Sequence, residues 1–180
     1  MSTVTVFGAG AWGSTMAQVL SDAGNDVLLW GRSKDVIAEI NSVHTNKKYL
    51  GAHELPHSLR ATTDLAQAFA HSHIYVLAIP AQQLRLTLQE WKPFFATDSI
   101  IVSTLKGIEI STQMRMTEVI EDVLGPRAVA IITGPNLADE LVLRQPAGAV
   151  AAAATQELAD HMRDLFRTPY RSEERRVGKE

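Results

Sequence analysis

The sequence contains no cysteine, which excludes a disulfide framework, a thiolate-bound metal and a cysteine nucleophile. Basic residues are not in excess either: 17 Lys and Arg stand against 20 Asp and Glu, so a general nucleic-acid-binding surface is not indicated. The longest run of small apolar residues, 147–154, is far shorter than the roughly 20 residues of a membrane span. The N-terminus shows no basic segment ahead of an apolar one, so we expect no secretory signal and a cytoplasmic protein.

Hydrophobic residues make up 46% of the 180 residues, enough for an ordered core. Apolar runs predict strands at 3–7, 26–30, 74–79, 99–103, 128–133 and 148–153. Amphipathic patterns and caps predict helices at 12–23, 33–40, 64–70, 82–91, 111–124, from Asn136 onward and at 156–166, with irregular structure at 41–61. This alternation predicts one α/β domain over residues 1–170, a doubly wound parallel sheet with helices on both faces.

Residues 8–13 read GAGAWG, which fits the pattern G-x-G-x-x-G directly after a predicted strand and at the start of a predicted helix. In such a turn Gly8 permits the tight bend, Gly10 lets a pyrophosphate approach the backbone, and Gly13 lets helix and strand pack closely. The N–H groups that open the helix would then face the anion. A glycine-rich turn without a ligand is the alternative, but the strand–turn–helix–strand context favours a dinucleotide.

The end of the second predicted strand bears on the choice between NAD and NADP. NAD sites usually carry an acidic residue there for the ribose 2′-hydroxyl, whereas this chain has Arg32 followed by Ser33 and Lys34. Because a guanidinium binds phosphate through two N–H groups, the sequence favours NADP over NAD. The alternative is that Arg32 is an exposed cation at a strand end.

Two further candidates follow predicted strands. Lys106 comes after the strand at 99–103 and could bind a phosphate or a polarised carbonyl, or could simply be solvated. The segment Gly134-Pro135-Asn136 comes after the strand at 128–133 and could present helix N-terminal amides to an anion, or could be an ordinary helix start capped by Asn136. The six histidines form no pair at helical spacing, so no metal site is assigned.

Several motifs occur together in a fixed order: GAGAWG, LLWGR at 28–32, NKKYL at 46–50, AIP at 78–80, LKGIE at 105–109 and GPNLADEL at 134–141. Together they resemble the bacterial NAD(P)-dependent glycerol-3-phosphate dehydrogenases, across essentially all of residues 1–171. The resemblance implies a Rossmann-like NAD(P)-binding domain and reversible hydride transfer between sn-glycerol 3-phosphate and dihydroxyacetone phosphate for phospholipid synthesis. It also implies a cytoplasmic enzyme that is commonly a homodimer.

The resemblance also implies roles for individual residues. Cofactor contacts fall on Gly8, Gly10, Ala11, Trp12, Gly13, Arg32, Lys106 and Ala138. Substrate contacts fall on Lys106, Gly134 and Asn136. The chain departs from the family at Ala11, where a Ser is common, and at Asn136, where a Ser or Thr is usual.

The family's proton-transferring lysine lies in an LxGxxKN segment, and no such segment occurs in these residues. The all-helical C-terminal substrate domain is missing too, so we expect a cofactor-binding fragment without turnover and no catalytic residue within it. Residues 171–180 carry four basic and three acidic residues; they are either a solvated tail or a foreign segment, since RSEERRVGKE resembles a translated sequencing adapter. A stand-alone dinucleotide sensor, or another two-domain reductase such as a ketopantoate reductase relative, remains an alternative.

Overall fold

The computed structural model describes residues 1–177, with side chains described as far as Arg171. Within these residues the strands are β1 (Thr3–Phe7), β2 (Asp26–Trp30), β3 (Arg60–Thr62), β4 (Ile74–Leu77), β5 (Ile100–Ser103), β6 (Ala128–Thr133), β7 (Ala147–Ala153) and β8 (Arg171–Val177). The helices are α1 (Ala11–Asp22), α2 (Lys34–Val43), α3 (Lys47–Leu50), α4 (Leu65–His71), α5 (Leu84–Trp91), α6 (Met116–Leu124), α7 (Ala138–Val142) and α8 (Gln156–Phe166), and short 3-10 turns lie at Ala81–Gln83 and Lys92–Phe94.

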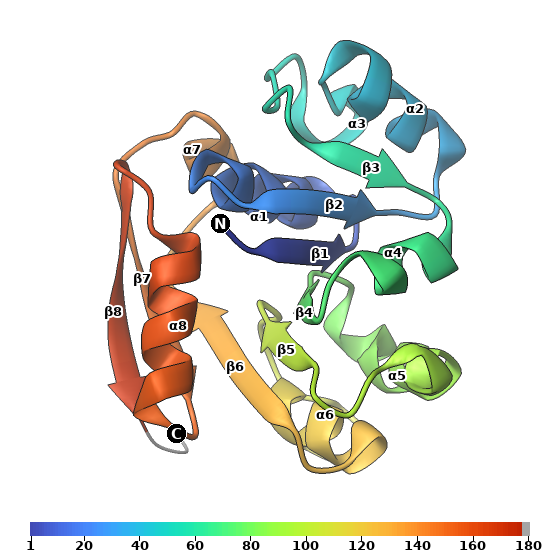
Figure 1. Cartoon of the computed structure of the whole chain (residues 1–180), viewed down its shortest axis with the longest axis vertical. Coiled ribbons are helices and arrows are strands. Elements are labelled where there is room, and N and C mark those ends of the chain that lie inside the picture. Colours follow the sequence, from blue (N-terminus) through green and yellow to red (C-terminus); the bar gives the residue numbers. More distant parts are fainter. Residues whose placement is uncertain (178–180) are drawn as a thin grey trace.

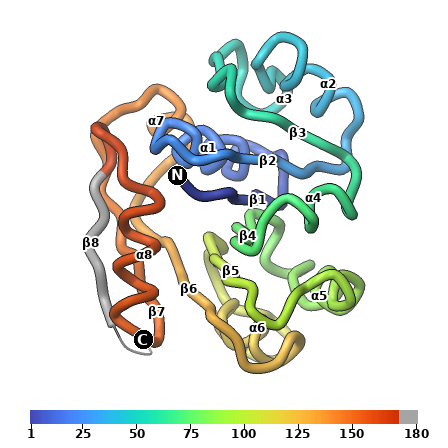
Figure 2. Tube along the Cα trace, in the orientation of Figure 1, coloured from blue at the N-terminus to red at the C-terminus, as the bar shows by residue number. Residues whose placement is uncertain are grey.

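The strands form one sheet in the order β3-β2-β1-β4-β5-β6-β7-β8 (Figure 1). Pairing is parallel from β3 through β6, and β1 lies between β2 and β4 in the middle of the sheet (Figure 2). The chain winds outward from β1 to β3, then returns to β4 on the other side of β1. Phe7 is in register with both Trp30 and Leu77, so β1, β2 and β4 end together. This reversal of strand order is where open α/β sheets hold their ligands.

Side chains of the central strands alternate between two hydrophobic cores. In β4, Ile74 and Val76 belong to one core and Tyr75 and Leu77 to the other. The first core takes side chains from α1, α2, α7 and α8, whereas the second takes them from α4, α5 and α6. Helices therefore cover both faces of the sheet, which explains why its strands are apolar throughout.

The predicted doubly wound α/β fold is confirmed for most elements. The bounds of β1, β2, β6 and α8 agree with the predicted ranges. Two predicted caps are also present: the Ser33 side chain accepts a hydrogen bond from the Val36 amide, and the Asp64 side chain accepts one from the Gln67 amide. These signals are local, so the sequence pattern was sufficient to predict them.

The prediction of an all-parallel sheet is wrong at β7, which pairs antiparallel with β6 (Ala130 opposite Ala153). The reason lies in α7, which has only five residues and spans about 7 Å, too little to carry the chain back across the sheet. The chain therefore re-enters at the edge where β6 ends. Residues 41–61, predicted as irregular, also contain α3 and the start of the three-residue strand β3.

Two predicted helix starts are wrong as well. The helix predicted at 111–124 begins only at Met116, because Ile108 and Arg115 form a bridge and Gln113 takes a positive φ of 59°. Asn136 is not an N-cap: Leu137 holds that position of α7, and Asn136 is buried.

At the C-terminal end, where no element was predicted, the backbone of residues 171–177 continues the sheet as β8, parallel to β7. The end of the charged segment, residues 178–180, lies outside the described residues. That this segment is foreign to the domain stays a prediction.

Candidate functional site

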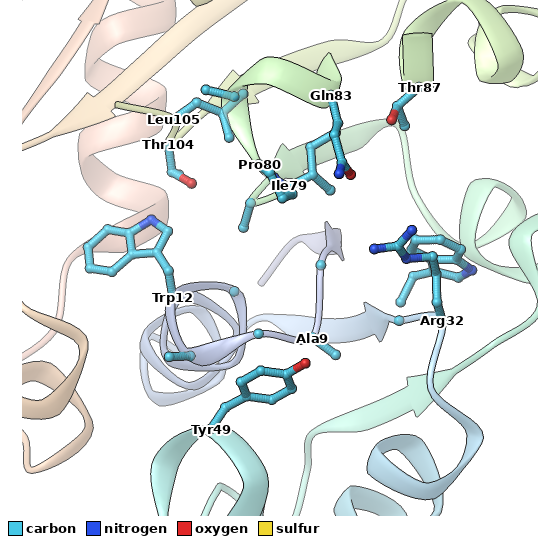
Figure 3. A pocket seen from close by; sticks show the side chains of 18 of the residues that line it. Ala9, Trp12, Arg32, Tyr49, Ile79, Pro80, Gln83, Thr87, Thr104 and Leu105 are labelled. Atoms are coloured by element: carbon cyan, nitrogen blue, oxygen red, sulfur yellow. The ribbon is translucent and has the colours of Figure 1, made fainter. Parts of the chain in front are cut away.

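A cleft of about 1020 Å³ opens at the carboxyl edge of the sheet, beside the residues that follow β1, β2 and β4. It is bounded by the whole 8–13 turn, by the end of β2 through Ser33, and by the segments that follow β4 and β5 (Figure 3). The predicted residues Gly8, Gly10, Ala11, Trp12, Gly13, Arg32 and Lys106 all line it. Residues up to about 100 positions apart in the sequence are thus brought to one surface.

Close backbone contacts fix the glycine-rich turn. Gly8 has a φ of 120°, and a Cβ there would lie 2.3 Å from the Ala78 carbonyl oxygen. A Cβ on Gly13 would lie 1.7 Å from the Gly8 carbonyl oxygen. Both positions therefore exclude any side chain. Gly10 differs, since a Cβ there meets nothing within 4 Å and would point into open space.

Helix α1 begins at this turn, and its first residues, Ala11, Trp12 and Gly13, line the cleft. Gly10 occupies the N-cap and supplies no side-chain cap, and the Ser14 amide donates to the Gly10 carbonyl at 3.0 Å. The amides of Ala11, Trp12 and Gly13 come before that first helical bond, so the helix provides them with no acceptor. Open space beside Gly10 together with these amides and the helix dipole fits a pyrophosphate.

Arg32 and Trp12 lie at opposite ends of the cleft, with Ala9 between them (Figure 3). Arg32 is exposed, so its guanidinium is accessible to a phosphate that enters the cleft. The Tyr49 side chain reaches toward Ala9 from α3 (Figure 3). The cleft thus offers an extended ligand a cationic end, a central backbone surface and an aromatic end.

Lys106 extends toward the Trp12 end. Its Nζ lies 5.4 Å from the centroid of the Trp12 ring and donates a hydrogen bond to the Asn136 carbonyl oxygen at 3.4 Å. Just before it, the Thr104 hydroxyl donates to the Leu77 carbonyl oxygen at 2.8 Å, which ties the end of β5 to β4. A positive charge therefore lies over an aromatic ring at the end of the cleft away from Arg32.

The sequence model of one family, described as the N-terminus of NAD-dependent glycerol-3-phosphate dehydrogenase, matches residues 3–159. The chain belongs to this family. It is 47% identical over 167 residues to a glycerol-3-phosphate dehydrogenase [NAD(P)+] of Streptomyces avermitilis, covering 92% of this chain and 50% of that protein. The glycerol-3-phosphate dehydrogenase [NAD(P)+] of Corynebacterium diphtheriae is 46% identical over 169 residues, covering 93% of this chain and 51% of that protein. The chain thus spans about half the length of these relatives.

Solved structures agree on the fold. The glycerol-3-phosphate dehydrogenase of Coxiella burnetii superposes with a TM-score of 0.89 at 23% identity, over 97% of this chain and 54% of that one. A pyrroline-5-carboxylate reductase from the same organism superposes with a TM-score of 0.73 at 16% identity, over 99% of this chain and 60% of that one. Because the fold is shared with a different reductase, membership in the dehydrogenase family rests on the sequence match and not on the fold.

Three predicted residues of this family member do not line the cleft: Gly134, Asn136 and Ala138. They lie behind its Trp12 end, where Asn136 is buried and Ala138 packs against the first core. A Cβ on Gly134 would lie 2.8 Å from the Asn136 side-chain nitrogen and 3.0 Å from the Gly148 carbonyl oxygen. The Asn136 carbonyl oxygen accepts a hydrogen bond from Lys106 of the cleft, but no residue of this segment lines it, so the substrate roles of the segment stay predictions.

Sequence reasoning missed several cleft residues, including Tyr49, Trp30, Gln83 and Thr87. It also missed Asn46, which is fully buried and donates from Nδ2 to the Ala9 carbonyl at 3.1 Å and to the Ser14 hydroxyl at 2.8 Å. Asn46 thereby attaches α3, and Tyr49 with it, to the glycine-rich turn. The NKKYL motif was the available signal, but its residues were not considered as site residues.

The described residues lack the features of a metal site and of a membrane span. Among the described residues, no three His, Asp or Glu side chains gather in a way that could hold a metal ion. No helix in that part of the chain combines the length and the apolar character needed to cross a membrane.

Proposed function

We propose that residues 1–170 are the cofactor-binding domain of an NADP-preferring glycerol-3-phosphate dehydrogenase. One observation carries the proposal: the turn with open space at Gly10 and uncapped amides at the start of α1 lies in one cleft between Arg32 and Lys106. The reaction proposed for the intact protein interconverts sn-glycerol 3-phosphate and dihydroxyacetone phosphate, for phospholipid synthesis. A bound NADP(H) would take up or supply the hydride.

Each cleft residue has a role in this proposal. The amides of Ala11, Trp12 and Gly13 bind the pyrophosphate, and the Arg32 guanidinium binds the adenosine 2′-phosphate. Lys106 places its ammonium group where cofactor and substrate meet, next to Trp12. Its charge would stabilise a substrate oxygen that gains negative charge during reduction.

The remaining assignments follow the resemblance and belong to this proposal. Gly134 and Asn136 contact the phosphorylated substrate, and Ala138 contacts the cofactor. The intact protein is a cytoplasmic homodimer. The 180-residue chain binds NADPH without appreciable turnover, because its sequence holds no LxGxxKN segment to provide the proton-transferring lysine.

Calorimetric titration of the 180-residue chain with NADPH and with NADH tests the cofactor assignment. We expect NADPH to bind more tightly. The Arg32→Ala variant should lose about tenfold in NADPH affinity, in line with one charge-assisted contact, while its NADH affinity stays within about twofold. Arg167→Ala is the matched control, because Arg167 is an equally exposed arginine outside the cleft.

Failure of both nucleotides to bind would overturn the proposal. Equal losses of NADPH and NADH affinity in Arg32→Ala would overturn the assignment of Arg32 to the 2′-phosphate. Rapid NADPH oxidation by the 180-residue chain in the presence of dihydroxyacetone phosphate would contradict the expected lack of turnover. A dinucleotide sensor and a dehydrogenase domain would both bind NADPH, and activity of the full-length gene product separates them.

A further inference from the structure

Lys106 lies on a segment that has neither helix nor strand. Residues 104–115 connect β5 to α6, and only isolated bridges and turns occur along them. At the upstream end, the Thr104 amide and hydroxyl both bond to the Leu77 carbonyl oxygen, at 3.2 Å and 2.8 Å. Since no regular element holds the rest of the segment, its position depends on side chains from elsewhere.

The downstream anchor begins two residues after Lys106. The Gln82 side chain donates to the Ile108 carbonyl oxygen at 2.8 Å, and its amide oxygen accepts from the Ile110 backbone amide at 3.0 Å. The exposed side-chain amide of Gln82 thus bonds to the backbone on both sides of Glu109, at Ile108 and Ile110, as the backbone of a neighbouring strand would.

An ion pair holds Glu109 between those two bonds. Arg85 of α5 donates from Nε to one carboxylate oxygen and from Nη2 to the other, each at 2.9 Å, and Thr112 also donates to this carboxylate. The Glu109 side chain is only 8% exposed and that of Arg85 only 22%. Burying such a pair is a poor way to gain stability, because desolvation offsets the attraction. A two-point fork does fix the direction of the chain that bears it.

Between the two anchors stand only three residues: Leu105, Lys106 and Gly107. Gly107 takes a φ of 104°, which an L side chain rarely adopts, so the turn back toward α5 is made immediately after Lys106. Neither Gln82 nor Arg85 lines the cleft. Neither residue is therefore placed to contact a ligand in the cleft directly, and the segment that they hold connects them to Lys106.

We propose that Gln82 and Arg85 are positioning residues that set the place of Lys106 in the cleft by holding residues 108–110 against α5 and the 3-10 turn before it. The inference rests on the proposed function in one respect, the contact of Lys106 with the cofactor. It goes beyond that function by assigning a role to two residues that touch neither cofactor nor substrate.

The test is a double-mutant cycle on the 180-residue chain, read by calorimetric titration with NADPH. Gln82→Ala is the main variant, because Gln82 is exposed and its loss removes both backbone contacts without opening the core. Gln89→Ala is the matched control, an exposed glutamine of α5, the helix that directly follows the 3-10 turn of Gln82. Each is made in the wild-type chain and in Lys106→Met. Arg85→Lys, which keeps the charge and loses the fork, provides a second variant.

We expect Gln82→Ala and Arg85→Lys to weaken NADPH binding by about fivefold or more in the wild-type chain, and Gln89→Ala to leave it unchanged. In Lys106→Met, the same two substitutions should cost less than about twofold, because the group that they position is gone. Thermal unfolding of each variant reports on the fold separately.

Equal losses in both backgrounds would show a general structural role and overturn the proposal, as would full affinity in Gln82→Ala. If Arg85→Lys does not fold, Gln82→Ala alone decides. No NADPH binding by the wild-type chain would instead refute the proposed function. Normal wild-type binding that is insensitive to Gln82 would refute only this inference.

Discussion

Two segments that line the cleft, the glycine-rich turn at 8–13 and the Lys106 segment at 104–115, are held in place in different ways. The turn is fixed by close backbone contacts, with no room for a Cβ at Gly8 or Gly13, and Asn46 adds a side-chain bond to the Ala9 carbonyl. The Lys106 segment is fixed by the side chains of Gln82 and Arg85, which reach it from the 3-10 turn at Ala81–Gln83 and from α5. The backbone contacts at Gly8 and Gly13 leave no space for a side chain, whereas the side-chain bonds to residues 108–110 can be removed one at a time by substitution. The two segments should therefore respond differently to substitution.

The largest effect is expected at Gly13. In Gly13→Ala the new methyl group would lie 1.7 Å from the Gly8 carbonyl oxygen, so either the turn or α1 must move. Overpacking of this kind costs about 1–3 kcal/mol of unfolding free energy, and the displaced amides should lower NADPH affinity about a hundredfold. Urea unfolding and calorimetry measure the two losses. Gly148→Ala is the control, since a Cβ there meets nothing within 4 Å. An unaffected Gly13→Ala would refute the account of the turn.

A smaller and more selective effect is expected at Gly10. A Cβ there meets nothing within 4 Å, and the backbone φ of −80° suits alanine. Gly10→Ala should change the unfolding free energy by no more than about 0.5 kcal/mol. The methyl group would nevertheless occupy the approach of the pyrophosphate, so NADPH affinity should fall about tenfold. Parallel losses of stability and affinity, as at Gly13, would contradict the idea that Gly10 is open for a ligand.

The smallest effect concerns the Lys106 segment, and it is a stability contribution that is lost in acid. Arg85, and after it Thr112, lowers the pKa of Glu109 below its usual 4.5. A carboxylate with a lowered folded-state pKa stabilises the fold above its unfolded-state pKa, and this contribution is lost as the pH falls through the folded-state value. The stability difference between wild type and Glu109→Gln should therefore be present at neutral pH and shrink below pH 4.5.

Urea unfolding at a series of pH values measures this difference, with Glu118→Gln as the control for a carboxylate of a half-exposed ion pair. A wild-type advantage over Glu109→Gln that persists undiminished in acid would contradict the role of the ion pair. No titratable group takes part in the close contacts of Gly8 and Gly13. The stability cost of Gly13→Ala should therefore not show this dependence on pH.

The same contrast explains how much could be predicted from the sequence. The turn was predictable because three glycines, a preceding strand and a following helix lie within 20 consecutive residues and act locally. The caps Ser33 and Asp64 were predictable for the same reason.

What was missed depends on contacts between distant residues. Arg85 and Glu109 are 24 residues apart, and Asn46 bonds to Ala9 across 37, so no local pattern reveals either. The direction of β7 depended on the length of α7, and the sequence pattern predicted no end for that helix. Residues that line the cleft were thus predicted better than the residues that hold them in place.

An amide-resolved NMR titration of the 180-residue chain with NADPH shows whether the cofactor binds at the glycine-rich turn. We expect saturable binding with the largest shifts at the amides of Gly10 to Gly13, and further shifts at Arg32 and at Lys106. Smaller changes should appear around residues 108–110 through their connection to Lys106. Saturable binding that leaves the amides of Ala11, Trp12 and Gly13 unshifted would contradict this expectation, because the cofactor would then lie elsewhere.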